Sequence, residues 1–132
     1  GAAGGLGFAF LSYTNAVLES GVKIILEETK LESFIKNADF VITGEGRLDG
    51  QTVMGKAPIG VAEIAKKYEK KVLAFGGCVA EDATLCNQHG IDAFFPILRT
   101  ITTLKEAMDF NHAKENLSAA VEQVFRLIQS FK

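Results

Sequence analysis

The sequence is poor in cysteine, with only Cys78 and Cys86 among its 132 residues. Two cysteines are too few for a disulfide framework. Seven residues separate them and no second pair follows, so their spacing does not match a zinc site either. This usage is typical of reduced thiols, and we therefore expect a cytoplasmic protein without a structural zinc ion.

The chain also lacks an excess of basic residues. Its 14 Lys and Arg stand against 16 Asp and Glu, which gives a net charge of −2. A nucleic-acid-binding surface needs concentrated Lys and Arg to neutralise phosphates, so we expect no nucleic-acid partner. With 48% hydrophobic and 23% charged residues, the composition is that of a globular protein, and its length suits one domain with a sizeable core.

No apolar run is long and pure enough for a membrane span. The longest apolar stretch, residues 2–18, is interrupted by glycine and by polar residues, and no basic residues precede it as they would in a signal peptide. We expect no membrane partner. The chain begins GAAGGLG without an initiator Met, which indicates a piece of a longer protein.

Three short segments rich in β-branched and aromatic residues predict strands at residues 39–43, 71–75 and 91–95. Helical patterns alternate with them, at residues 6–17, 21–28, 31–37, 58–68, 81–89 and 113–131, with a short capped helix from Thr103. The first of these, apolar nearly all round, predicts a buried helix. The alternation predicts an α/β fold, a parallel sheet flanked by helices as in flavodoxin or Rossmann proteins. Three strands are few for such a sheet, so we expect an incomplete domain.

A polar, glycine-rich segment follows the first predicted strand, and we expect residues 44–57 to form a loop. Ligands bind beyond the carboxyl ends of strands in open α/β sheets, and a connection this long is more often functional. Arg47 and Lys56 can pair with phosphate or carboxylate oxygens, while Glu45 and Asp49 can hold Mg²⁺ or accept a proton. The alternative is a solvated connection whose charges pair with one another.

Two familiar nucleotide-binding patterns nearly match this loop and both fail. Gly50 and Gly55-Lys56 have the spacing of a P-loop, but Ala57 stands where that motif needs Ser or Thr. Gly44 and Gly46 begin a dinucleotide fingerprint, but Asp49 takes the place of its third glycine. Glycines near the start of the chain, Gly4 and Gly5 among them, indicate either a second anion cradle or close packing of the first helix.

Five segments resemble, in this order, the C-terminal part of bacterial glycerate kinases: GAAGGLGFAF, GVKIILE, ADFVITGEGRLDGQT, GKAPIGVAEIAKKY and HGIDAFF. These enzymes form the glycerate 2-kinase family, which is unrelated to the P-loop kinases. The resemblance covers nearly the whole chain, and GEGRLDGQT followed by GKAPIGVA is its most specific part. It implies ATP-dependent phosphorylation of D-glycerate to a phosphoglycerate with Mg²⁺, in a two-domain α/β protein.

The resemblance and the chemistry of the loop together give a set of site residues. We expect Asp49 to be the catalytic base with Arg47 beside it, and Glu45 and Asp49 to hold Mg²⁺. Glycerate is expected to contact Glu45, Arg47 and Thr52, because the guanidinium fork of Arg47 suits a carboxylate. The residues expected to contact ATP are Gly44, Gly46, Lys56, Gly4 and Gly5.

The same resemblance implies that residues 1–132 are the C-terminal α/β segment of such a kinase, with its N-terminal part absent. We therefore expect the chain alone to be inactive. Removing neighbouring segments exposes apolar surface or an unpaired strand edge, so we also expect it to self-associate. The alternative function is a non-catalytic α/β module that binds a nucleotide or another anion.

Overall fold

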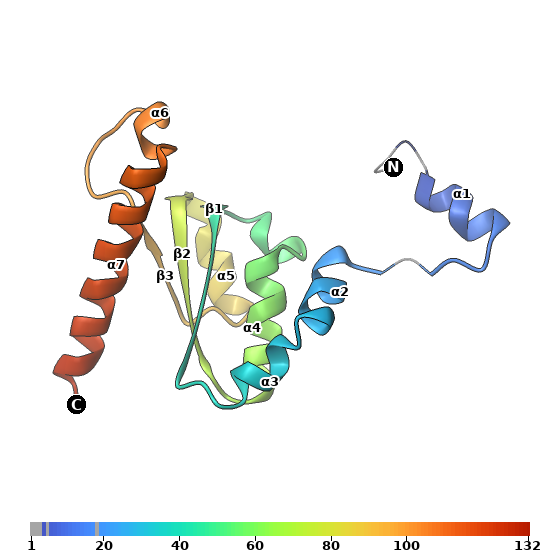
Figure 1. Cartoon of the computed structure of the whole chain (residues 1–132), viewed down its shortest axis with the longest axis horizontal. Helices are drawn as coiled ribbons and strands as arrows, with labels where there is room; N and C mark the ends of the chain where they lie inside the picture. The colour runs from blue at the N-terminus through green and yellow to red at the C-terminus, as the bar shows by residue number, and fades with distance from the viewer. Residues whose placement is uncertain (1–3, 5, 18) are drawn as a thin grey trace.

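The computed structural model describes residue 4 and residues 6–17 and 19–132 of the chain. Gly5, one of the predicted ATP contacts, lies outside the described residues. The elements in chain order are α1 (Leu6–Tyr13), α2 (Gly21–Glu28), α3 (Leu31–Ile35), β1 (Phe40–Leu48), the 3₁₀ helix η2 (Thr52–Met54), α4 (Ala57–Lys67), β2 (Lys71–Val79), the 3₁₀ helix η3 (Glu81–Thr84), α5 (Leu85–Gln88), β3 (Ala93–Pro96), α6 (Leu104–Ala107) and α7 (Phe110–Ser130) (Figure 1).

The three strands form one parallel sheet in the order β1-β2-β3. Val41 pairs with Val72, and Leu73 pairs with Ala93. The central strand β2 is buried along residues 72–76, as expected where helices cover both faces of a sheet. The predicted α/β class with a parallel sheet and flanking helices is therefore confirmed.

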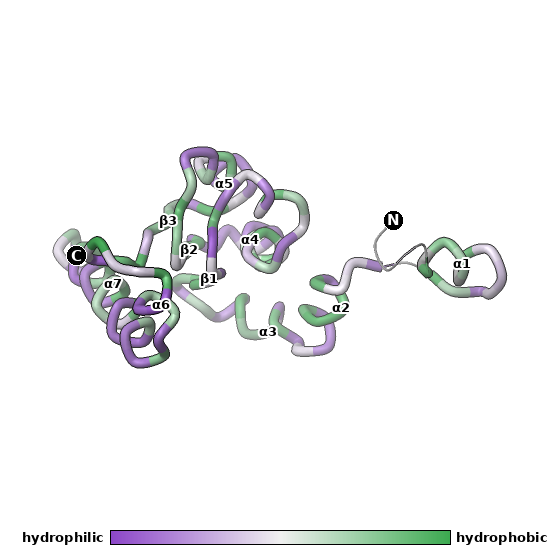
Figure 2. Tube along the Cα trace, turned by 90° about the horizontal axis from the view of Figure 1, so that it is seen from above, coloured by the Kyte–Doolittle hydropathy of each residue, from purple (hydrophilic) through white to green (hydrophobic). Residues whose placement is uncertain are grey.

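Helices lie on both faces of this sheet. Figures 1 and 2 show α4 and α5 on one face and α7 on the other, with α2 and α3 beside α4. The core is correspondingly divided into two layers. On the α4 face it contains Ile35, Val41, Leu48, Ile59, Ala62, Ala65, Val72, Ala74, Ala83, Cys86 and Ile91. On the α7 face it contains Leu73, Phe75 and Val124, with Phe40, Phe95, Val121 and Ile128 packed against them.

Helix α4 shows why the sequence folds this way. Pro58 lies in its first turn, where a missing N–H costs nothing, and Ile59, Ala62 and Ala65 recur at helical spacing and are buried against the sheet. A Cβ added at Gly60 would lie within 3 Å of side chains of α2, so this glycine lets α2 pack closely on α4. The helix thereby joins the sheet to the N-terminal helices.

Capping residues place the C-terminal helices. Thr103 and Glu106 form the predicted capping box at the start of α6. Hydrogen bonds to the Glu106 carboxylate lower its pKa to about 2; the Thr103 backbone N–H is the main cause, and the Thr103 and Thr102 hydroxyls add to it. The Asp109 carboxylate accepts the His112 backbone N–H and so begins α7.

No helix among the described residues is long and apolar enough to cross a membrane.

The prediction of a buried helix at residues 6–17 is wrong. Helix α1 is shorter and stands apart from the two layers (Figure 1), with Phe8 75% and Tyr13 87% exposed. An apolar composition favours burial only where another element supplies the opposing surface. Among the α1 side chains that the structure describes, Leu6 and Leu11 are exposed as well.

The predicted loop at residues 44–57 is also wrong in its first part, because β1 continues through Leu48. The reason is close contact between backbones: a Cβ at Gly44 would lie 2.4 Å from the Phe75 carbonyl oxygen, and one at Gly77 would lie 2.7 Å from the Gly46 carbonyl oxygen. Glycine in these strands marks close approach of β1 and β2, where the sequence pattern indicates a turn. The connection to α4 is thus only residues 49–56.

Leu48 provides a test of this extended strand. It is fully buried at the end of β1, so Leu48→Ala should lower the free energy of unfolding by about 2–5 kcal/mol, through lost burial and the cavity left behind. Met54, 82% exposed in η2, is the control, and Met54→Ala should change it by less than about 0.5 kcal/mol. Urea unfolding followed by circular dichroism measures both, and equal effects would contradict the strand assignment.

Candidate functional site

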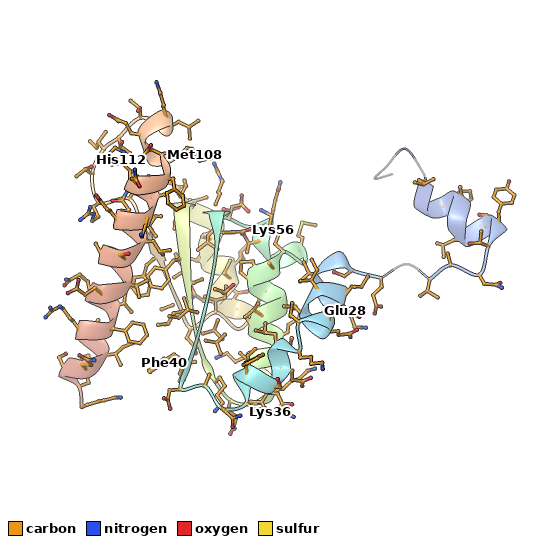
Figure 3. All side chains as sticks on the ribbon, in the orientation of Figure 1. Glu28, Lys36, Phe40, Lys56, Met108 and His112 are labelled. Atoms are coloured by element: carbon orange, nitrogen blue, oxygen red, sulfur yellow. The ribbon has the colours of Figure 1, made fainter. Side chains whose placement is uncertain are left out.

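The charged residues predicted from the sequence lie together at the carboxyl edge of the sheet. Glu45 and Arg47 come from the last residues of β1, Asp49 follows the strand directly, and Lys56 precedes the first residue of α4. Figure 3 shows Lys56 at this end of the molecule, on the same side as the tips of the strands. Parallel strands and the start of a helix therefore bring to one place the four charges that we call the carboxyl-edge cluster.

A reciprocal turn fixes the backbone beneath this cluster. The Oδ1 atom of Asp49 accepts the N–H groups of Gln51 at 3.0 Å and Thr52 at 3.2 Å, while Thr52 Oγ1 accepts the Asp49 N–H at 3.1 Å. This is the arrangement of a capping box, in which the side chains of two residues three apart each bind the other's backbone. The Asp49 carboxylate is thus held at the start of η2.

Two cations lie beside the carboxylates. Arg47 Nε lies 3.2 Å from Asp49 Oδ2, and Lys56 Nζ lies 3.6 Å from Asp49 Oδ1 and 4.0 Å from Glu45 Oε2. The Asp49 and Glu45 side chains are mostly covered, at 17% and 19% exposure, whereas Arg47 is 63% and Lys56 40% exposed. The charges do pair with one another, as the alternative interpretation of the loop expects, but the two cations still face solvent.

The pKa of Asp49 follows from this setting. Partial burial, the largest single influence, raises it, but the Lys56 ammonium and the backbone N–H groups of Gln51 and Thr52 together outweigh burial and hold the pKa below its usual value. Asp49 is therefore ionised at neutral pH. A carboxylate in this state can accept a hydrogen bond from an alcohol or bind a cation.

The structure separates the predicted glycines. A Cβ at Gly46 would have no heavy atom within 4 Å, so the backbone here is open to an approaching ligand, whereas Gly44 is packed against Phe75. Gly4 has a φ of +61° and lies two residues before α1, a helix that stands apart from the sheet (Figure 1). The structure therefore does not bring Gly4 to the carboxyl-edge cluster.

Thr52, predicted to contact substrate, is fully buried. Its hydroxyl donates a hydrogen bond to Glu45 Oε1 over 2.5 Å, in addition to accepting the Asp49 N–H. From the protein interior, its side chain thus binds the Glu45 carboxylate and the Asp49 backbone.

The carboxylates of the cluster fit a magnesium ion that takes most of its ligands from phosphate and water. Among the described residues, no three His, Cys, Asp or Glu side chains are grouped so that they could hold a metal ion by themselves. Mg²⁺ is commonly bound through one or two carboxylates, with phosphate and water oxygens completing its shell. Glu45 and Asp49 provide such a pair.

One neighbour of the cluster was not predicted from the sequence. A Cβ at Gly50 would lie 2.5 Å from Asp82 Oδ2, so the Asp82 carboxylate, from the start of η3, lies over this turn. The pKa of the nearby Cys86 thiol is raised. Burial of the thiol is the main cause, and the negative charges of Glu45, Asp49 and Asp82 add to it. The sequence could have indicated Asp82 by its position along the chain, because Asp82 follows the second strand and so lies at the same edge of the sheet.

An apolar hollow of about 370 Å³ adjoins the cluster on the α7 side of the sheet. Its lining includes the apolar side chains of Ile42, Phe75, Ile97 and Leu117, together with Glu45. The carboxyl-edge cluster and this mostly apolar hollow therefore share Glu45.

Comparison with known proteins gives a consistent result. The family described as "Glycerate kinase family" matches residues 1–129. Glycerate kinase from Bacillus subtilis is 45% identical over 132 residues, all of this chain and 34% of that protein. Glycerate 2-kinase from Escherichia coli is 45% identical over 124 residues, 94% of this chain and 32% of that protein.

A solved structure agrees. The crystal structure of a Salmonella typhimurium LT2 protein described as glycerate kinase 2 superposes with a TM-score of 0.71 at 39% identity, over 98% of this chain and 31% of that one. The chain thus spans about a third of the length of these relatives. Since the family match covers almost every residue, the chain belongs to the glycerate kinase family.

Proposed function

We propose that this chain is the C-terminal part of a kinase that transfers a phosphoryl group from ATP to D-glycerate in the presence of Mg²⁺. The observation that carries the proposal is the carboxyl-edge cluster, in which two exposed cations lie against two ionisable carboxylates, in a chain of the glycerate kinase family. Phosphoryl transfer requires mainly that reactants be positioned and their charge be neutralised. The cluster has side chains for both tasks.

The cations suit the anionic groups of the two substrates. Both phosphate and the carboxylate of glycerate need positive partners, and the planar guanidinium of Arg47 can bind either with two parallel hydrogen bonds. Lys56 supplies a point charge, and its position just before α4 adds the positive end of that 11-residue helix. The open backbone at Gly46 lets phosphate oxygens approach main-chain N–H groups.

The carboxylates suit the metal ion and the alcohol. Glu45 and Asp49 would hold Mg²⁺, which when bound neutralises charge on the phosphates. Asp49, ionised at neutral pH, would accept the proton of the attacking glycerate hydroxyl. Arg47, at 3.2 Å, orients that carboxylate.

A second candidate is a module that binds a nucleotide or another anion without catalysis. It is favoured by the internal pairing of the charges, which leaves each carboxylate already neutralised. We propose a cytoplasmic location for either function, since Cys78 and Cys86 are both unpaired.

A hybrid enzyme separates catalysis by Asp49 from its role in the turn. In the hybrid, this chain replaces the matching third of Bacillus subtilis glycerate kinase, and a coupled assay with ATP, Mg²⁺ and D-glycerate measures turnover. Asp49→Asn keeps an oxygen that can accept the Gln51 and Thr52 N–H groups but removes the charge. We expect kcat to fall about 10²–10⁴-fold with a much smaller change in KM.

Two further measurements complete this test. Asp49→Ala removes the turn acceptor as well and should additionally lower the melting temperature, whereas Asp49→Asn should not. An active hybrid whose kcat is unchanged by Asp49→Asn would exclude Asp49 as the base. A hybrid with no turnover that still binds ATP would favour the non-catalytic module.

Gly46 tests whether a ligand approaches the backbone. Gly46→Ala adds a methyl group where the protein has no atom within 4 Å, so stability should be preserved, but KM for ATP should rise at least about tenfold if phosphate oxygens contact this backbone. Gly21→Ala, equally open but in α2, is the control and should change neither quantity. An unchanged KM in the Gly46 variant would remove Gly46 from the ATP site.

The chain by itself should be inactive and should associate. It spans a third of its relatives, β1 has one unpaired edge in the described sheet, and Phe8, Ile101 and Phe110 are among its exposed apolar residues. The same coupled assay should detect no glycerate-dependent turnover, and light scattering should give a mass that rises with concentration. Turnover equal to that of the hybrid, or a strict monomer at all concentrations, would contradict these expectations.

A further inference from the structure

Thr52 is unusual, because among the described residues it is the only buried one whose side chain carries an oxygen or nitrogen atom. Its hydroxyl is fully used: it accepts the Asp49 N–H at 3.1 Å and donates to Glu45 Oε1. A buried hydroxyl with two such partners is held in one orientation. It therefore fixes the atoms to which it is bonded.

The residue contacts three members of the carboxyl-edge cluster. Besides the hydroxyl contacts with Glu45 and Asp49, its backbone N–H lies 3.2 Å from Asp49 Oδ1, and its carbonyl oxygen accepts the Lys56 backbone N–H at 3.3 Å. Thr52 thus joins the end of β1, the turn and the start of α4. No other residue described here has hydrogen bonds to all three of these charged residues.

The consequence is seen at Lys56. Its ammonium lies 3.6 Å from Asp49 Oδ1 and 4.0 Å from Glu45 Oε2, and both distances exceed the 2.7–3.2 Å of an N–H···O hydrogen bond. Two carboxylates that could move freely would close on this ammonium, because charge-assisted hydrogen bonds are the strong ones. With both carboxylates fixed, the ammonium is attracted to them but keeps its hydrogen-bond donors for another partner.

We propose that Thr52 is a positioning residue: its hydroxyl holds the Glu45 carboxylate and its backbone N–H holds the Asp49 carboxylate, so that neither moves onto Lys56 and this ammonium stays available to an anionic substrate. The identity of that anion, ATP or glycerate, rests on the proposed function. The positioning itself does not, and it can be measured in the protein without any ligand.

The direct test is structural and uses the 132-residue chain. Thr52→Val keeps the shape of the side chain but removes its hydroxyl, and Thr52→Ser keeps the hydroxyl. In crystal structures of the two variants, the distance from Glu45 Oε2 to Lys56 Nζ should shorten to hydrogen-bond length with Val and stay near 4.0 Å with Ser. An unchanged Glu45 carboxylate in the Val variant would overturn the proposal, and if that variant does not fold, Thr52→Ala gives the same comparison.

Kinetics in the hybrid enzyme then show whether positioning matters to the reaction. Thr52→Val should raise KM for an anionic substrate at least about tenfold, and Thr52→Ser should restore it to within about twofold. Thr103→Val removes a hydroxyl that serves only the capping box of α6 and should leave KM unchanged. If Glu45 shifts in the crystal but the parent hybrid has no turnover, the proposed function alone is refuted. If the hybrid is active and Thr52→Val leaves its KM unchanged, the positioning role is refuted.

Discussion

The close parallel pairing of β1 with β2 determines where the site lies. Gly44 and Gly77 allow the two backbones to approach to distances that a side chain would prevent, and this pairing extends β1 to Leu48. The extension is what carries Glu45 and Arg47 to the carboxyl edge, next to Asp49. With β1 ending at Thr43, the same charges would be distributed along a flexible connection, without fixed distances between them.

The charged groups of the carboxyl-edge cluster are held at fixed distances from one another. The 3.2 Å contact between Arg47 and Asp49 lowers the freedom of the carboxylate, while Lys56 stays beyond hydrogen-bond length from both carboxylates. Charges held in this way would need no rearrangement to meet a charged substrate, and preorganised charges of this kind are what the proposed phosphoryl transfer requires. The buried hydroxyl of Thr52 connects this arrangement to the protein interior.

Much of this could be predicted from the sequence, for physical reasons that differ between segments. Residues 40–43 are β-branched or aromatic between polar boundaries, and α4 has a proline in its first turn and apolar residues at helical spacing, so local preferences and tertiary structure agree there. The grouping of the charged residues from Glu45 to Lys56 was predictable because they lie within one short segment. Gly44 and Gly46 led to the wrong prediction of a loop, since a glycine within a strand and a glycine in a turn look the same in the local sequence. The exposure of α1 and the position of Asp82 depend on which elements meet in space.

The most direct measurement is a crystal structure of the hybrid enzyme with D-glycerate, Mg²⁺ and a non-hydrolysable ATP analogue. We predict that Arg47 and Lys56 lie within hydrogen-bond distance of phosphate or carboxylate oxygens, and that Asp49 lies within the same distance of a glycerate hydroxyl or the metal ion. Substrates bound elsewhere, with the carboxyl-edge cluster still paired only to itself, would contradict the assignment of this cluster as the kinase site.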